Sequence, residues 1–282
     1  MIAGAYAAAV KWGDLLPAIH DAHSPWRYAL LFGALPALPL ILIRPFLPES
    51  PVWREKRAAG TLKRPSFREL FAPRLRRVTL VSTGLVACCY ALASGMLQHI
   101  PRLVPGLPQV AALPHKDQEL WVSWVHVHVD TGALIGRLIL TGLVVWFVSR
   151  RPMLRAMLWA GLALYPLVFF GPALQDAEVF KYAVLLVTLV VGIQYSYWGN
   201  YLPRVFPLHL RGTGESFAIS IGARVLAPFT VLATTQLSNV MPGANPTIQL
   251  AHSMAVVAVA VTLCALLLVR WLPEPAAELP ED

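Results

Sequence analysis

The stretch from Phe180 to Pro228 decides the fold, because it holds two long apolar runs joined by a short basic segment. It reads FKYAVLLVTLVVGIQYSYWGNYLPRVFPLHLRGTGESFAISIGARVLAP. Each run is close to the ~20 residues that an α-helix needs to cross a bilayer. The joining segment, Leu202–Gly214, carries Arg204, His209 and Arg211. The pattern predicts two membrane-spanning helices joined by a basic turn.

The composition of the whole chain also indicates a membrane protein. Of its 282 residues, 57% are hydrophobic and 13% are charged, whereas soluble domains average about 25% charged residues. The three cysteines, Cys88, Cys89 and Cys264, all lie inside apolar runs. Their arrangement contains neither a disulfide framework nor a zinc-binding pattern.

The apolar residues come in blocks of about 20, which favours membrane spans over a soluble core. We therefore expect an all-α, multi-pass transmembrane helical bundle. The sequence gives eight candidate spans, at about 2–19, 28–46, 78–98, 122–147, 154–172, 180–201, 213–235 and 251–270. The first is the weakest candidate, because Lys11 and Asp14 interrupt it.

Lysine and arginine are distributed unequally between the two sides of these spans. Sixteen flank one side, four flank the other, and three lie inside spans. Since cytoplasmic loops carry the excess of positive charge, we expect both termini to be cytoplasmic. The net charge of +8 is then a topology signal, and we expect no nucleic-acid partner.

Several local motifs carry a family resemblance. YLPRVFP (201–207) and RGTG (211–214) precede a span with an arginine in its interior. PWRYALLFGALPA (25–37) and LPESPVW (47–53) bracket the second span. Together these segments resemble the sugar-and-metabolite branch of the major facilitator superfamily, although Val52 stands where the family motif PESPRW has arginine.

The resemblance implies a twelve-helix fold of which this chain would supply helices five to twelve, with the four preceding helices missing. It implies four regions: 1–46 as the last two helices of an N-terminal bundle, 47–77 as a basic cytoplasmic linker, 78–271 as a complete six-helix C-terminal bundle, and 272–282 as an acidic cytoplasmic tail. Two similar segments, RPFLPES (44–50) and RWLPEP (270–275), each follow a span. This similarity is expected if the protein consists of two related halves, as such transporters do.

The span over 122–147 carries the first group of candidate site residues. His126, His128 and Asp130 form an H-x-H-x-D pattern, but at about 100° per residue a helix turns His128 away from His126. A strand would bring all three together, and an isolated strand cannot span lipid, so we expect no metal site. His126, Asp130 and Arg137 instead form one stripe, which is either a proton or substrate site or a packing contact with other helices.

The span over 180–201 carries a second group. Gln194, Tyr197, Trp198 and Tyr201 share one helix face at positions i, i+3, i+4 and i+7. This face is either the hydrogen-bonding wall of a substrate cavity or part of an interfacial aromatic belt. Gly192, Ser196 and Gly199 share another face, on which small residues permit close helix packing.

Arg224 lies roughly 16 Å along the next span from Thr213, about half the hydrocarbon thickness. Arginine stays protonated in proteins, so Arg224 must face protein, water or an anion. Arg137 and Arg224 are opposed by one deep carboxylate in the 78–271 region, that of Asp130. This imbalance favours an anionic substrate, unless the missing helices supply the counter-charge and the substrate is a neutral sugar.

Charged residues at the cytoplasmic ends of the spans suggest a gate. The family pattern G-x-x-x-D-R-x-G-R-R is similar to GLVVWFVSRR (142–151), which keeps the final arginines and lacks the aspartate. We expect Glu274 to pair with Arg211 or Arg151. The gate candidates are Glu49, Arg150, Arg151, Arg211 and Glu274.

The predicted function is secondary active transport of a small polar metabolite (an organic acid, sugar or sugar phosphate) by alternating access, with protons as the expected coupling ion. The expected location is the bacterial inner membrane. A non-transporting scaffold or receptor on the same fold is the alternative. The sequence has no HExxH, Walker or Ser/His/Asp arrangement, so we expect neither an enzyme nor a cofactor.

Overall fold

The computed structural model describes residues 2–12, 17, 25–35, 37–47, 51–60, 65–146 and 150–275, and every regular element in these ranges is helical. This confirms the predicted all-α, multi-pass bundle. The α-helices are α1 (Ile2–Trp12), α2 (Pro25–Ala34), α3 (Ala37–Ile43), α4 (Pro51–Ala58), α5 (Arg76–Met96), α6 (Ile100–Leu103), α7 (Pro108–Ala111), α8 (His115–Trp146), α9 (Arg150–Phe169), α10 (Ala177–Val205), α11 (Arg211–Val225), α12 (Ala227–Ser238) and α13 (Pro246–Leu268).

Seven helical segments of the described chain are long and apolar enough to cross a membrane. They correspond to the second to eighth spans expected from the sequence: Trp26–Phe46, Arg76–Gly106, His115–Val144, Arg150–Gln175, Ala177–Val205, Leu208–Ser238 and Pro246–Trp271. The expected first span is represented by α1, whose 11 residues are too few to cross a bilayer alone. Residues 13–16 and 18–19 of that expected span lie outside the described residues.

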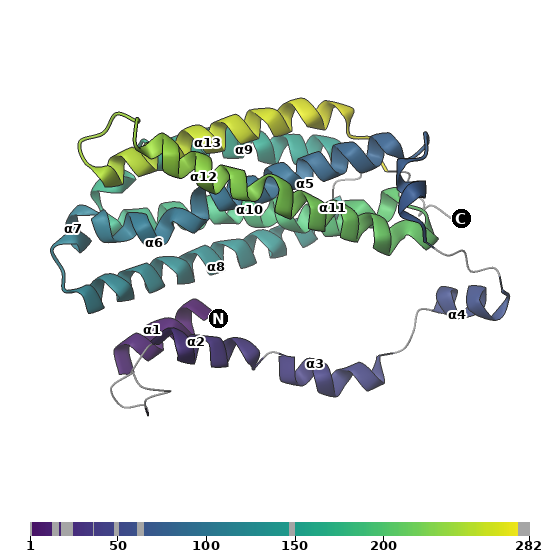
Figure 1. Ribbon diagram of the computed structural model, residues 1–282, viewed down its shortest axis with the longest axis horizontal. Coiled ribbons are helices and arrows are strands. Elements are labelled where there is room, and N and C mark those ends of the chain that lie inside the picture. Colours follow the sequence, from purple (N-terminus) through teal and green to yellow (C-terminus); the bar gives the residue numbers. More distant parts are fainter. Residues whose placement is uncertain are drawn as a thin grey trace.

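Six of these segments form one bundle, with α5 against α11, α12 and α13 on one side and α10 against α8 and α9 on the other (Figure 1). The contacts follow a two-fold pattern: α5 packs on α11–α12 and α13, as α10 packs on α8 and α9. Helices that occupy equivalent places in this pattern, such as α5 and α10, run in opposite directions. The bundle therefore resembles an inverted repeat that exchanges α5 with α10, α8 with α11–α12, and α9 with α13.

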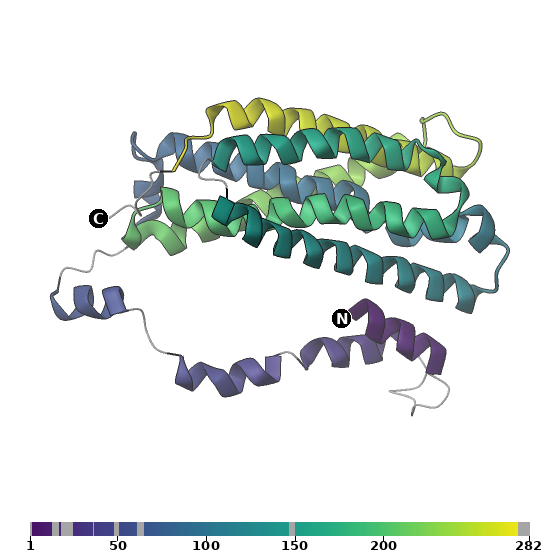
Figure 2. The ribbon, with the colours of Figure 1, turned by 180° about the vertical axis from the view of Figure 1, so that it is seen from behind.

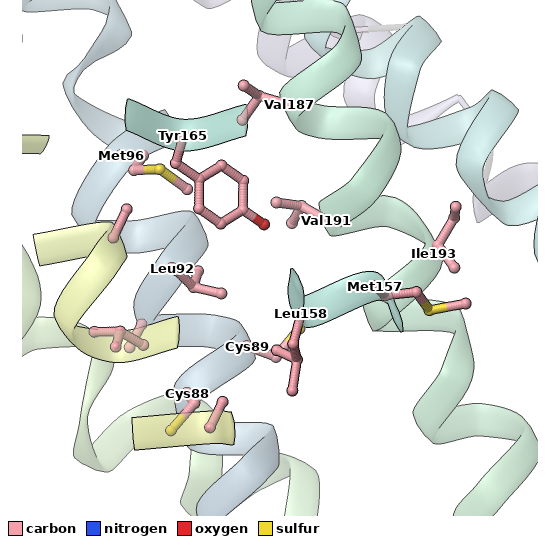
Figure 3. Close-up of a cluster of buried hydrophobic side chains, with 14 of the residues drawn as sticks. Cys88, Cys89, Leu92, Met96, Met157, Leu158, Tyr165, Val187, Val191 and Ile193 are labelled. Carbon is pink, nitrogen blue, oxygen red and sulfur yellow. The ribbon is translucent and has the colours of Figure 1, made fainter. Parts of the chain in front are cut away.

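The core of the bundle lies where α5, α9 and α10 meet (Figure 3). Tyr165 of α9 is fully buried there, between α5 and α10. The remaining labelled core side chains are aliphatic or contain sulfur: Cys88, Cys89, Leu92, Met96, Met157, Leu158, Val187, Val191 and Ile193.

The N-terminal helices lie along one side of this bundle (Figure 2). α1 packs on α8, and the Tyr6 hydroxyl donates a hydrogen bond to Glu119 Oε1 at 3.3 Å. By contrast, the described part of α3 has no buried residue.

The end of the expected linker is an ordered part of the bundle. The short 3₁₀ helix Phe67–Phe71 buries Leu70 completely, and the Thr79 hydroxyl donates to the Leu70 carbonyl at 2.8 Å. The rings of Phe67 and Phe71 lie 6.5 and 5.5 Å from the ring of Phe217 on α11. Residues 65–75 thus belong structurally to the six-helix bundle.

Small residues bring α8 and α10 into backbone contact. A Cβ atom built on Gly136 would lie 2.2 Å from the Leu189 carbonyl oxygen, and one on Gly132 would lie 2.2 Å from that of Leu185. Gly192 faces α8 in return, since its Cβ would lie 2.5 Å from the Ala133 carbonyl oxygen. This G-x-x-x-G pattern permits the close helix approach typical of membrane interfaces, and it supports the predicted packing role for Gly192.

The close contact predicts opposite responses to alanine at two glycines of α8. Gly136→Ala places a methyl group against backbone, and such overpacking costs about 1–3 kcal/mol. Gly142→Ala meets nothing within 4 Å, and alanine is a better helix former than glycine by about 1 kcal/mol. Thermal unfolding in detergent should therefore show a lowered midpoint for Gly136→Ala alone. Equal midpoints for both variants would contradict the contact.

Candidate functional site

The exposed face of α8 carries the predicted stripe. Arg137 and Asp130 are exposed and His126 is half-buried. His126 Nδ1 lies 3.0 Å from the Val122 carbonyl oxygen, so in the neutral ring Nδ1 donates and Nε2 remains a proton acceptor. Gly136, next to Arg137, faces Leu189 and Ile193, which flank the midpoint of α10, so Arg137 lies at the middle of the bundle's depth.

Two tyrosines accompany Arg137, and the sequence did not point to either of them. The Tyr90 and Tyr195 rings meet edge to face, with centroids 4.9 Å apart. Gly136, the residue before Arg137, meets the Ile193 backbone two residues before Tyr195, so Arg137 and Tyr195 lie at the same depth on adjacent helices. Tyr90 sits in the apolar run of α5, and Tyr195 directly follows Gln194, so neither stands out by spacing. The structure adds both to the candidate site.

Arg224 lies beside a break in its helix. Pro228 has no N–H group to continue the hydrogen-bond ladder, and α11 ends at Val225 before α12 begins at Ala227. Gly222 packs against Val86 and Ala87, at the midpoint of α5, so Arg224 also lies at mid-depth. Interrupted helices near the membrane midplane are common at transport sites.

Two threonines hold α12 against α5 after the break. The Thr230 hydroxyl lies 3.1 Å from the Ala91 carbonyl oxygen, and the Thr234 hydroxyl donates to the Gly95 carbonyl at 3.0 Å. Arg224 itself is exposed, and its Nη1 donates to the Ser220 carbonyl at 3.4 Å. The two hydroxyl contacts fix α12 against α5. Arg224 is the deep cation on the exposed face of α11.

Small-molecule sites are typically about 300–1,000 Å³ in volume, and α11 borders a cavity of about 650 Å³. Its walls include Thr213, Ser216 and Ser220 of α11, with Pro65 and Phe67 from the linker end. Ser220 lies one turn from Arg224, so this cavity extends along α11 from the basic end of the bundle toward the helix break.

The predicted polar face of α10 lies inside the six-helix bundle. Gln194, Tyr197 and Trp198 are only 2%, 0% and 3% exposed. Tyr197 packs edge to face on Trp198 and stacks on Tyr201, with centroids 5.0 and 5.6 Å away. These residues are therefore not on the exposed side that carries Arg137, and their role in substrate binding stays a prediction.

At the basic end, Glu274 binds backbone rather than only side chains. Its carboxylate accepts hydrogen bonds from the N–H groups of Arg150 at 3.0 Å and Arg151 at 2.9 Å, the first two residues of α9. A carboxylate at a helix N-terminus is favoured both as a hydrogen-bond acceptor and by the helix dipole.

Arg151 of α9 in turn binds backbone carbonyls after α13. We call the contacts of Glu274 and Arg151 together the inner clamp. Its side chain donates to the Val269 carbonyl at 2.9 Å and to the Arg270 carbonyl, which lie at the end of α13. The Tyr201 hydroxyl adds a hydrogen bond of 2.6 Å to the Pro273 carbonyl. The inner clamp thus joins α9, α10 and the segment after α13.

The other gate candidates are placed separately. Arg150 is 6% exposed and its Nη1 donates to the Val144 carbonyl at 3.1 Å, whereas Arg211 Nε is buried and makes no hydrogen bond in the described part of the chain. Glu49 lies outside the described residues. The structure also reveals a pair that the sequence analysis did not consider, with His209 Nε2 3.1 Å from Glu69 Oε1.

The inner clamp predicts that Glu274→Gln destabilises the protein. A glutamine keeps one acceptor oxygen but loses the charge, and losing a helix cap costs about 0.5–2 kcal/mol. Glu215→Gln, in the first turns of α11, is the charge-matched control, because within the described residues no side chain caps the N-terminus of α11. Chemical or thermal unfolding should separate the two variants, and equal stability of Glu274→Gln and wild type would rule out the cap.

Comparisons with known proteins point to transport. No protein-family model matches the chain. It is 24% identical over 200 residues to the inner membrane metabolite transport protein YhjE of Escherichia coli, covering 70% of this chain and 44% of that protein. It is 25% identical over 218 residues to the cis,cis-muconate transport protein of Acinetobacter baylyi, covering 73% and 49%. The chain thus spans about half the length of the curated relatives it matches, and it is similar at low identity to membrane transport proteins.

Proposed function

We propose that this chain forms the substrate-handling bundle of a major-facilitator-type secondary transporter for small organic anions. The observation that carries the proposal is that Arg137, Tyr195 and Tyr90 lie at mid-depth on the adjacent helices α8, α10 and α5, with the two tyrosine rings in contact. A guanidinium and phenol hydroxyls are the donors that a carboxylate accepts.

Charged side chains deep in a membrane are costly and usually functional. Arg137 and Arg224 are exposed in the middle of their spans, and a charged side chain at that depth faces a bundle interior or a water-filled path. Neither guanidinium has a carboxylate partner in the described part of the chain. An anionic substrate would supply the compensating charge.

The relatives support the same substrate class. One relative is named for cis,cis-muconate, a dicarboxylate, whose two charged ends would suit two separate arginines. The other is named for metabolites in general. We extend the dicarboxylate class to this chain and leave the individual compound to experiment.

Proton coupling is the accompanying proposal. His126 and Asp130 lie on the same helix as Arg137, toward the end opposite the inner clamp. His126 Nδ1 faces the Val122 carbonyl oxygen, which leaves Nε2 as the proton-accepting atom of the neutral ring. With the arginine-rich end facing the cytoplasm of a bacterial inner membrane, protons would meet His126 before they reach Arg137.

The proposal predicts charge-selective loss of binding. Purified protein is titrated with cis,cis-muconate, other dicarboxylates and the uncharged dimethyl ester of muconate, with thermal stabilisation as the readout. Arg137→Gln and Arg224→Gln should each weaken dicarboxylate binding at least about tenfold, because a hydrogen bond to a charged group contributes about 1.5–3 kcal/mol.

Arg155→Gln is the matched control, because Arg155 is exposed on α9, a helix that packs on α10 and α13. This variant should bind dicarboxylates as wild type does. Stabilisation of the wild type by neutral sugars but not by any dicarboxylate would overturn the anionic assignment. So would equal weakening of charged and uncharged ligands by Arg137→Gln and Arg224→Gln.

A further inference from the structure

A second cavity lies at the end of the bundle opposite the inner clamp, between the first turns of α8 and α10. Its volume is about 450 Å³, and its walls include Asp117, Trp121 and Trp124 of α8 with Glu178 and Lys181 of α10. The cavity combines two carboxylates, one ammonium and two indole rings. It lies on a different part of the molecule from the arginine-bearing site.

The depth of this cavity corresponds to lipid headgroups. Val191 is the midpoint of α10, so Lys181 lies about 15 Å and Glu178 about 20 Å from the middle of the span. The hydrocarbon core extends about 15 Å to either side of the bilayer centre, and the headgroup region adds roughly 5–7 Å. Lys181 is thus at the hydrocarbon boundary and Glu178 among the headgroups.

Lys181 is held in place at this boundary. Its ammonium forms an ion pair with Glu178, and the whole Lys181 side chain is 16% exposed. It also lies 5.7 Å from the centre of the Trp121 ring and 5.3 Å from that of Tyr182. These contacts hold the ammonium on the headgroup side of the hydrocarbon boundary, as expected for a lysine that keeps its charge near water.

A lipid-facing stripe continues from the cavity toward the middle of the membrane. Val179, Tyr182 and Leu186 are 52%, 57% and 51% exposed along one side of α10. Trp124, at the cavity wall, is 54% exposed. Acyl chains can lie along this stripe while the attached headgroup reaches the cavity.

We propose that this cavity binds the headgroup of a phosphatidylethanolamine-type lipid, in which a primary ammonium follows a phosphate. Asp117 and Glu178 would accept hydrogen bonds from the lipid ammonium, and the indole faces would favour the same cation. Lys181, at the hydrocarbon boundary, would form an ion pair with the lipid phosphate.

Charge decides between headgroups. The carboxylates of Asp117 and Glu178 and the ammonium of Lys181 give the cavity walls one net negative charge. A zwitterionic headgroup can place its cation toward that charge, whereas the anionic headgroup of phosphatidylglycerol meets repulsion. Phosphatidylcholine has a cation that cannot donate hydrogen bonds, so the two carboxylates would bind it less well.

The experiment measures binding of matched lipids to the purified protein in detergent by native mass spectrometry. Phosphatidylethanolamine, phosphatidylcholine and phosphatidylglycerol with identical acyl chains are the probes. We expect phosphatidylethanolamine to bind about two- to fivefold more tightly than phosphatidylglycerol. Asp117→Asn and Glu178→Gln should each abolish this preference, because each leaves the cavity without net negative charge.

Glu215→Gln, at the opposite end of the bundle, removes the same charge and should keep the preference. Binding of phosphatidylglycerol gives an internal check that the variants remain folded. Equal binding of the two lipids by the wild type would overturn the proposal, and so would an unchanged preference in both cavity variants.

Discussion

The backbone contact between α8 and α10 is the interaction on which the rest of the structure depends. Gly132, Gly136 and Gly192 leave no room for a Cβ atom between the two helices. Because the backbones meet, Arg137 and Tyr195 lie at the same depth on adjacent helices. The same alignment brings the first turns of the two helices together around Lys181. The two proposed binding sites therefore depend on one contact.

Seven of the eight expected spans could be predicted, because each of the seven is a block of apolar residues whose length matches the bilayer. The faces of α10 could not. Gln194 and Tyr195 are adjacent, both can form hydrogen bonds, and helical spacing does not say which of them turns toward the core. The structure buries Gln194 and leaves Tyr195 half-buried beside Tyr90. Only the packing of α10 on its neighbours decides between the two faces.

The arginine-rich end of the bundle was predicted in part for a similar reason. The charge cluster expected at the ends of the spans includes Glu274 and Arg151, and the Glu274 carboxylate accepts a hydrogen bond from the Arg151 N–H group. However, the acceptors and donors that they use include backbone groups at the ends of α9 and α13. Backbone groups have no sequence signature, so a search for opposite charges finds the residues but not the contact. A helix end in a membrane protein must satisfy its free amides, and Glu274 does so for α9.

The inverted arrangement of the bundle relates the two helices that carry deep arginines. It exchanges α8 with α11–α12, and these helices carry Arg137 and Arg224. Since exchanged helices run in opposite directions, equivalent positions share the same depth only near the middle of the membrane. Both arginines lie at that depth, one beside a pair of tyrosines and the other beside a helix break. A substrate with two negative ends would satisfy both charges at once, and a monoanion would leave one of them without a counter-charge. The pseudo-symmetry of the helices thus favours a dicarboxylate within the proposed class of organic anions.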